Sequence, residues 1–358
     1  MNVDFIIVGQ GIAGTCCAFQ LIKNQKSFII IDKEEDNSAS KIALGVYNPL
    51  VLKWFTKVWK ADEQISYFYK FYDEIEHFLK HTFIKDEGIY KYLKTVHAQN
   101  MWLSKSASKH KVDYMSQKIL TINKEGLLNK NFYGLVKKAG RIDIPLLLKL
   151  FKDYFLDKKI LIQDTFNYQK LVIKNHGVSY NDISSKKIIF CEGVSLLDNP
   201  YFKHLNLKPT KGEILSFYCK GLNLNKILHS KFLLIPLGND YYSVGATYNW
   251  QNLNNTCTIE AKDEIKSMLD KTLKLPYKII SHRSGIRPST FDRRSIVGSH
   301  PQYKNIYILN GLGTRGVLLS PYLSKSLVDY IYCRRSLDPE VDIKRFEMNI
   351  NNSCRNKE

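Results

Sequence analysis

A glycine-rich turn between an apolar strand and an amphipathic helix opens the sequence and constrains its fold more than any other feature. Residues 3–8 (VDFIIV) form a short β-branched run that is typical of a buried strand. The turn that follows has the spacing GxGxxG over residues 9–14, and an amphipathic segment continues to about Lys23. A second apolar run, 27–31, ends at Asp32, which lies 21 residues after Gly11 (32 − 11). This order predicts a nucleotide-binding unit of strand, turn, helix and strand with a terminal acid.

Each of these residues has a physical task. Gly9 permits the tight turn, Gly11 lets the backbone approach a pyrophosphate, and Gly14 lets the helix pack closely on the strand. The helix N-terminus presents free N–H groups and a partial positive charge to the phosphates. An acid at the strand end favours a free ribose 2′-hydroxyl, hence FAD or NAD over NADP. The residues that we expect to contact the dinucleotide here are Gly9, Gly11, Ile12, Ala13, Gly14, Asp32 and Lys33.

The middle of the chain favours FAD over NAD. An NAD dehydrogenase would usually continue with compact alternation of strands and helices, whereas residues 60–83 form a long helical stretch rich in Tyr and Phe. We interpret these aromatic side chains as core packing. Strand-like segments follow at 88–93 and 118–122, and Asp143 and Pro145 then open another helix as its N-cap and first-turn residue. Further strands are predicted at 159–162, 170–173 and 187–191, so the nucleotide fold resumes after an insertion.

Two motifs near the C-terminus complete the pattern. The first is Gly285-Ile286-Arg287-Pro288. The second is Gly311-Leu312-Gly313-Thr314-Arg315-Gly316-Val317, which follows a strand at 306–309, and Pro321 is expected at the head of the closing helix.

This ordered set resembles the family of FAD-dependent D-amino-acid oxidases and glycine oxidases from Val3 to about Tyr332. The resemblance implies an α/β fold (α+β overall), in which a Rossmann-type FAD-binding domain is interleaved with a mixed-sheet substrate domain. We expect the FAD-binding domain to comprise 1–58, 138–207 and 282–346, the substrate domain 59–137 and 208–281, and residues 347–358 to form a tail.

The resemblance also implies site residues. Arg287 stands where the family pairs an arginine with the substrate carboxylate, for which its planar bidentate guanidinium is suited, although it could instead pair with a structural acid. Lys211 either faces the flavin or substrate or ends a solvated strand, and Arg315 and Tyr47 are the other residues expected at the catalytic centre. The additional flavin contacts that we expect are Gly45, Gly193, Gly313, Thr314, Arg315, Gly316 and Val317.

The expected reaction is hydride transfer from the carbon beside an amine to FAD, giving an imine that water hydrolyses. The first expected substrate is a small amine with a carboxylate, either an amino acid or an N-substituted glycine, with oxygen or another electron acceptor. The alternative is the carboxymethylaminomethyl-uridine of tRNA, because several stretches resemble the oxidase half of the bifunctional enzyme that modifies that uridine. The sequence departs from that enzyme by carrying no methyltransferase half and by Asn48, which lengthens the pattern at 45–50. Leu233 stands where glycine oxidase has a Tyr, which argues against plain glycine.

Charge and composition leave the partner open. The 53 basic and 34 acidic side chains give a net charge of +19, which fits either RNA binding or compositional drift with dispersed lysines. No apolar run approaches the roughly 20 residues of a membrane span, and no secretion signal precedes the first strand. Seven cysteines in no metal or disulfide pattern predict reduced thiols, so we expect a soluble cytoplasmic protein without a metal ion.

Overall fold

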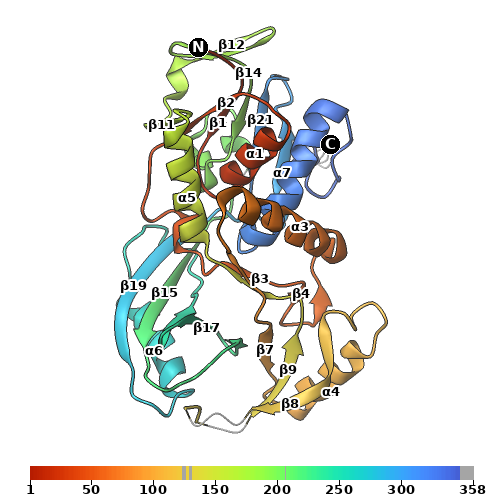
Figure 1. The fold of residues 1–358 in the computed structure, drawn as a ribbon, viewed down its shortest axis with the longest axis vertical. Coiled ribbons are helices and arrows are strands. Elements are labelled where there is room, and N and C mark those ends of the chain that lie inside the picture. The colour runs from red at the N-terminus through yellow and green to blue at the C-terminus, as the bar shows by residue number, and fades with distance from the viewer. Residues whose placement is uncertain (123–125, 129–130, 206, 347–358) are drawn as a thin grey trace, which may run out of the picture.

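The computed structural model describes residues 1–122, 126–128, 131–205 and 207–346. Its upper half in Figure 1 contains an eight-stranded sheet in which β11, β2, β1, β14 and β21 run parallel. Antiparallel β12, β13 and β20 extend it. The strands are β1 (Asn2–Val8), β2 (Phe28–Asp32), β11 (Leu161–Gln163), β12 (Leu171–Lys174), β13 (Gly177–Tyr180), β14 (Ile183–Phe190), β20 (Ile296–Ser299) and β21 (Ile306–Asn310).

A second eight-stranded sheet forms the lower half, in the order β19-β15-β18-β17-β16-β7-β9-β8. Its pairs are antiparallel except for β16 with β7, so the sheet is mixed. The strands are β7 (Ile89–Tyr92), β8 (Met115–Ile122), β9 (Asn131–Val136), β15 (Thr210–Tyr218), β16 (Ile227–His229), β17 (Leu233–Gly238), β18 (Tyr241–Gly245) and β19 (Lys278–Arg287).

Short strands connect the halves. They are β3 (Val46–Tyr47), β6 (Ile84–Lys85) and β10 (Gly140–Ile142) in one sheet, and β4 (Leu50–Val51) with β5 (Thr56–Lys57) in another. The mixed α/β fold confirms the predicted class. The predicted domain boundaries stay predictions, and the one at 282 falls inside the continuous strand β19.

Helices cover the upper sheet and the outer edges of the lower one (Figure 1). They are α1 (Ile12–Lys23), α2 (Ala39–Ile42), α3 (Ala61–Leu79), α4 (Val96–Ser106), α5 (Ile144–Asp157), α6 (Ile259–Asp270) and α7 (Gly316–Cys333). Both α1 and α3 pack against α7. As predicted, Asp143 caps α5, because its Oδ1 accepts a hydrogen bond from the N–H of Leu146 at 3.2 Å.

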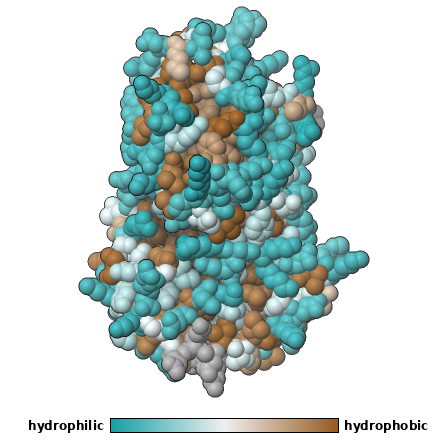
Figure 2. All heavy atoms as spheres, viewed as in Figure 1, coloured by the Kyte–Doolittle hydropathy of each residue, from teal (hydrophilic) through white to brown (hydrophobic). Residues whose placement is uncertain are grey.

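The aromatic stripe of α3 lies in the core, as predicted. Phe68, Phe71 and Tyr72 are fully buried among residues of α1, α5 and α7. Outside the core, the face shown in Figure 2 is mostly hydrophilic, with hydrophobic side chains in scattered groups. The buried aromatic side chains of α3 therefore serve core packing.

The closing helix begins earlier than the sequence suggested. Pro321 is the sixth residue of α7 and not its head, because the glycine-rich turn itself forms the first helical turn. A proline at this position cannot donate to the carbonyl of Val317. The buried hydroxyl of Tyr72 donates to that carbonyl at 3.1 Å, so α3 supplies the hydrogen bond that α7 lacks.

Removing this hydroxyl should destabilise the protein. We expect Tyr72→Phe to lower the free energy of unfolding by about 1–3 kcal/mol, since a buried carbonyl is left without a donor. Denaturant unfolding of the apoprotein measures the change. Tyr332→Phe, at a ring that is 39% exposed, is the control and should leave the free energy of unfolding nearly unchanged. Equal stability of the two variants would contradict the assigned bond.

Candidate functional site

A cavity of about 1010 Å³ opens at the carboxyl ends of the parallel strands and extends to the lower sheet. Residues that follow β1, β2, β14 and β21 line it, which is the edge where open α/β sheets bind ligands. None of the helices in the described part of the chain has the length and apolar character needed to cross a bilayer.

The first glycine turn has the geometry that its sequence predicted. Gly9 has φ +98°, and a Cβ on it would lie 2.6 Å from the carbonyl oxygen of Cys191. A Cβ on Gly14 would overlap the carbonyl oxygen of Gly9, so this glycine sets the approach of α1 to the strand and does not line the cavity. Gly11, Ile12 and Ala13 do line it, and the Gly11 cap makes no side-chain hydrogen bond to the helix. The N-terminus of α1 therefore faces the cavity.

Asp32 stands at the end of β2 and lines the cavity together with Lys33. Its Oδ1 accepts from the N–H of Gln10 at 2.8 Å and its Oδ2 from the N–H of Glu34 at 3.0 Å. These bonds fix the carboxylate beside the glycine turn, where the sequence placed a ribose acceptor.

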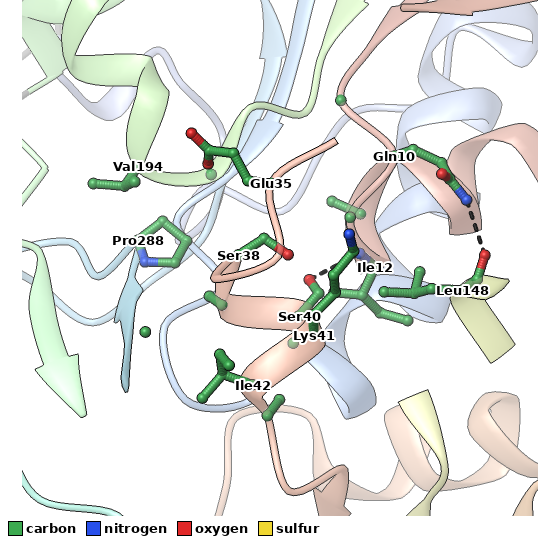
Figure 3. Close-up of a pocket in the computed structure, with 18 of the residues that line it drawn as sticks. Gln10, Ile12, Glu35, Ser38, Ser40, Lys41, Ile42, Leu148, Val194 and Pro288 are labelled. Carbon is green, nitrogen blue, oxygen red and sulfur yellow. Dashed lines mark hydrogen bonds between the residues drawn. The ribbon is translucent and has the colours of Figure 1, made fainter. Parts of the chain in front are cut away.

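The residues from Glu34 to Leu44 form a wall of the cavity, and none of them was predicted from the sequence. Their neighbour Gly45 was predicted and also lines the cavity. In Figure 3, Ser38, Ser40 and Lys41 lie beside Ile12, and the Ser40 Oγ accepts from the Ile12 N–H at 3.0 Å. Ser40 thus occupies a first-turn amide of α1 and is placed to contact an anion bound there. In the sequence, Ser40 could be recognised only as part of a polar loop between two predicted strands.

Glu192 is a second residue that sequence reasoning missed, although its neighbour Gly193 was expected and lines the cavity with it. The carboxyl accepts from the Tyr168 hydroxyl at 2.6 Å and from the Asn199 Nδ2 at 2.7 Å. Burial raises the pKa of Glu192 to about 7. This side chain is therefore partly protonated near neutral pH.

The second glycine turn brings a second helix N-terminus to the cavity. Gly313, Thr314, Gly316 and Val317 line it, and no side chain caps α7 at Arg315. The Arg315 side chain, however, turns away from the lining and donates to the carbonyls of Asn48 and Leu50, at 3.4 Å each. It ties the second glycine turn to the segment that joins β3 to β4.

Arg287 ends β19 inside the cavity, where the sequence expected it. Its guanidinium carbon lies 4.7 Å from the ring centre of Tyr248, and Nη1 donates to the Thr247 carbonyl at 3.3 Å. Burial lowers the pKa of Arg287, yet no carboxylate lies within ion-pair distance of it among the described residues. A half-buried guanidinium that lines a cavity without an acidic partner is suited to bind an anionic ligand.

Gly212 makes room for this guanidinium. The residue lies opposite Gly285 in the β15–β19 pair, and a Cβ on it would lie 2.5 Å from the Nη1 of Arg287.

We expect Gly212→Ala to displace the side chain of Arg287 while FAD stays bound. The KM of a carboxylate substrate should rise about 10-fold or more, because misplacing a hydrogen bond between two charged groups costs over 1 kcal/mol. Steady-state kinetics and the bound-flavin spectrum measure this effect. An unchanged KM would contradict the position of Arg287.

Two other expected catalytic residues do not line the cavity. Lys211 precedes Gly212 on β15, and since neighbouring strand residues point to opposite faces, its side chain lies on the far face. It is fully buried there and is neither a flavin contact nor a solvated strand end. Tyr47 likewise follows Val46, which lines the cavity, so the Tyr47 side chain lies on the other face of its strand. Its hydroxyl donates to the Asp86 Oδ1 at 3.0 Å, and its ring packs on Phe68. Both corrections follow from the alternation of strand side chains.

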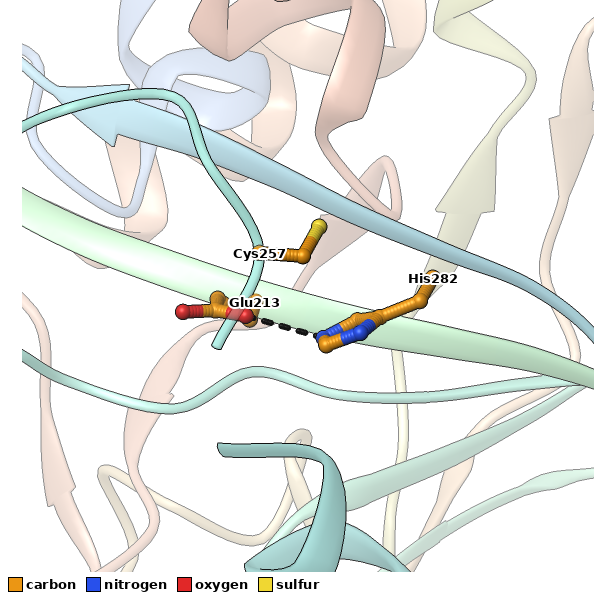
Figure 4. A group of neighbouring side chains, drawn as sticks. All are labelled: Glu213, Cys257 and His282. Carbon is orange, nitrogen blue, oxygen red and sulfur yellow. Dashed lines mark ion pairs between the residues drawn. The ribbon is translucent and has the colours of Figure 1, made fainter. Parts of the chain in front are cut away.

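A cluster of potential metal ligands lies on that far face, although the sequence spacing gave no sign of it. The ligand atoms of Glu213, Cys257 and His282 lie within 4.8 Å of one another (Figure 4). The Glu213 carboxylate already faces the Lys211 ammonium at 3.3 Å and the His282 Nε2 at 2.9 Å. The Lys211 ammonium already offsets the charge of this carboxylate, and the absence of a metal ion remains our prediction. The six cysteines of the described residues are free thiols, and Cys354 and the predicted tail lie outside them.

The cavity residues fit a flavin dinucleotide. The N-termini of α1 and α7 face one cavity, as a pyrophosphate and a reduced flavin ring each require, and neither N-cap residue, Gly11 or Arg315, makes a side-chain hydrogen bond to its helix. Asp32 stands at the end of β2, beside the first of these N-termini. Gly9, Gly11, Gly313 and Gly316 line the cavity, so at these four positions no side chain enters the space that a cofactor would fill. The residues that would hold FAD are thus Gly11, Ile12, Ala13, Asp32, Ser40, Gly313, Thr314 and Gly316.

Comparisons with known proteins agree with this site. A family model described as "DAO: FAD dependent oxidoreductase" matches residues 4–330. Glycine oxidase of Bacillus licheniformis is 30% identical over 139 residues, which are 36% of this chain and 37% of that protein. A tRNA 5-methylaminomethyl-2-thiouridine biosynthesis bifunctional protein of Idiomarina loihiensis is 25% identical over 127 residues, 34% of this chain and 21% of that protein. The alignments thus span less than half of these relatives.

The fold comparison covers more of the chain. The crystal structure of glycine oxidase from Bacillus cereus ATCC 14579 superposes with a TM-score of 0.76, covering 93% of this chain and 96% of that one at 19% sequence identity. At this identity the similarity establishes a shared fold.

Proposed function

This chain belongs to the DAO family of FAD-dependent oxidoreductases, and from that premise we propose that it oxidises the C–N bond of an amino acid or N-substituted glycine. The observation that supports this substrate class is the half-buried guanidinium of Arg287, which lines the cavity without an acidic partner among the described residues. It would bind the substrate carboxylate through two parallel N–H···O hydrogen bonds.

The cofactor of this family supplies the acceptor for the hydride that leaves the carbon beside the amine. The residues of the chain have the task of orientation. Arg287 anchors the carboxylate, so that the neighbouring carbon faces the N-terminus of α7, and Tyr248 and Thr247 hold the guanidinium in place. Histidine is absent from the cavity lining in the described residues, which fits a reaction that needs a neutral amine more than a protein base.

Product analysis tests which carbon is presented. Because the carboxylate is anchored, sarcosine should be oxidised at its methylene carbon, and water should then release glyoxylate and methylamine from the imine. Formaldehyde and glycine, from oxidation at the methyl carbon, would contradict this binding mode. Trapping of the released carbonyl compound with a hydrazine distinguishes the two products.

A second candidate is the removal of the carboxymethyl group from 5-carboxymethylaminomethyl-uridine in tRNA. The Idiomarina relative and the net charge of +19 support it, and Arg287 would bind the same glycyl carboxylate. Binding of such a tRNA should weaken steeply with salt, since phosphate contacts release counterions. Binding that does not change with salt would exclude the basic surface as the docking face.

A further inference from the structure

Two exposed aromatic rings stand in series beside the substrate arginine. Tyr248 lines the cavity and is 56% exposed, and its ring covers the Arg287 guanidinium. Trp250 is also 56% exposed and stacks on Tyr248, with 6.1 Å between ring centres and 25° between planes. Tyr248 lines the cavity and Trp250 stands next to it, so an exposed aromatic surface continues outward from the cavity along the two rings.

The segment that carries these rings is held in register with the sheet. The N–H of Lys211 donates to the Asn249 carbonyl at 2.8 Å, and the N–H of Asn249 donates to the Lys211 carbonyl at 3.0 Å. The Asn249 Oδ1 then accepts from the N–H groups of Gln251 and Asn252 at 2.9 and 3.0 Å. Asn249, between the two rings, is therefore fixed on both sides, and the rings have a defined direction.

Buried charges anchor the far end of the same segment. The Glu213 carboxylate accepts from the N–H of Thr258 at 2.8 Å and from its hydroxyl at 2.9 Å. The Lys211 ammonium donates to the carbonyl of Thr256 and to the Asn254 Oδ1. Lys211 and Glu213, with exposed fractions of 0% and 2%, thus clamp residues 254–258. This clamp explains why two charged residues point away from the cavity.

Between 246 and 258 the segment contains no charged residue, whereas Arg287 and Arg283 line the cavity beside it. A ligand that spans both features needs an anionic end for Arg287 and an uncharged flat end for the rings. We propose that Tyr248 and Trp250 bind a planar ring carried on the substrate amine, so that the preferred substrates are N-(arylmethyl)glycines. This inference rests on the proposed function, because it takes Arg287 as the carboxylate anchor.

The experiment compares N-benzylglycine with sarcosine, which share the glycyl group and differ only in the ring. The wild-type holoenzyme should show a lower KM for N-benzylglycine. Trp250→Ala should raise the KM for N-benzylglycine about 10-fold, as expected for the loss of one aromatic stacking partner, and leave the KM for sarcosine unchanged. Trp54→Ala is the matched control, since Trp54 is 57% exposed but lies in the β4–β5 turn. It should change neither value.

Two further arms identify the source of the ring. The free nucleoside 5-carboxymethylaminomethyl-uridine and a tRNA that carries it both present a pyrimidine on the amine. Trp250→Ala should weaken whichever of these reacts, and a reaction of the tRNA alone assigns the ring to a nucleic acid. Equal KM values for N-benzylglycine and sarcosine, or equal losses on both in Trp250→Ala, would overturn the inference while the proposed function stands. Failure of every glycyl amine to reduce the flavin would overturn the proposed function itself.

Discussion

Gly11→Val should purify as a folded protein that has lost its FAD. The backbone of Gly11 has φ −68°, a value that any residue adopts, and a Cβ there would meet only the Ser40 Oγ, at 3.1 Å. The fold therefore tolerates a side chain, whereas the two methyl groups of valine would project into the space where a pyrophosphate must approach the α1 amides. We expect bound FAD to fall to below about one tenth of the wild-type content, because a loss of over 2 kcal/mol in binding is more than 30-fold.

The absorbance ratio of flavin to protein measures this content after gel filtration. Thermal unfolding of the two apoproteins provides the control, since a fold defect would lower the midpoint of the variant before any cofactor is added. A fully loaded Gly11→Val protein would contradict the placement of the pyrophosphate at this turn. Ser40→Ala should weaken FAD binding by less, because the α1 amides remain.

Arg287→Met should raise the substrate KM about 30- to 1000-fold, the effect of about 2–4 kcal/mol expected when one partner of a buried charge pair is removed. Methionine retains much of the apolar stem against Tyr248, so the cavity keeps its shape. The flavin content should not change, because Arg287 lies at the lower sheet and not on either glycine turn. Steady-state kinetics with saturating FAD separate the two effects.

Arg283→Met is the matched control for charge. Arg283 is exposed, lines the same cavity, and precedes Arg287 on β19 by four residues, hence on the same face of the strand. Loss of a general positive potential would affect both variants alike. We expect the KM for a small substrate to change less than about 3-fold in Arg283→Met, as is usual for an exposed charge. Similar losses in both variants would remove Arg287 from its assigned role.

The sequence was sufficient for the features that depend on local pattern. The strand–turn–helix unit at 2–23, the acid at Asp32 and the second turn at 313–317 are short-range arrangements, and the structure shows each in the expected geometry. The position of Arg287 in the cavity could be predicted because its motif ends a strand at the cavity edge.

The sequence was insufficient where the face of a strand or a distant contact decides the outcome. A shift of one residue along β15 exchanges Gly212 for Lys211 at the cavity, and the strand pattern alone does not fix that register. Arg315 depends on carbonyls 265 and 267 positions away, and Ser40 depends on a loop that returns to α1. Glu192 gave no signal because its environment, and not its motif, raises its pKa.

The most direct test of the central claim is anaerobic reduction of the bound flavin, followed by loss of its absorbance near 450 nm as expected for the flavin that this family carries. Glycine, sarcosine, a panel of D-amino acids and tRNA with the carboxymethylaminomethyl uridine are added in parallel with methylamine and benzylamine, and dithionite gives the full amplitude. The account predicts that at least one amine with a carboxylate reduces the flavin and that the amines without one do not, because Arg287 must hold the substrate. Two results would contradict this account. The first is reduction of the flavin by methylamine or benzylamine as fast as by any carboxylate-bearing amine. The second is reduction by none of the amines while dithionite still reduces the flavin.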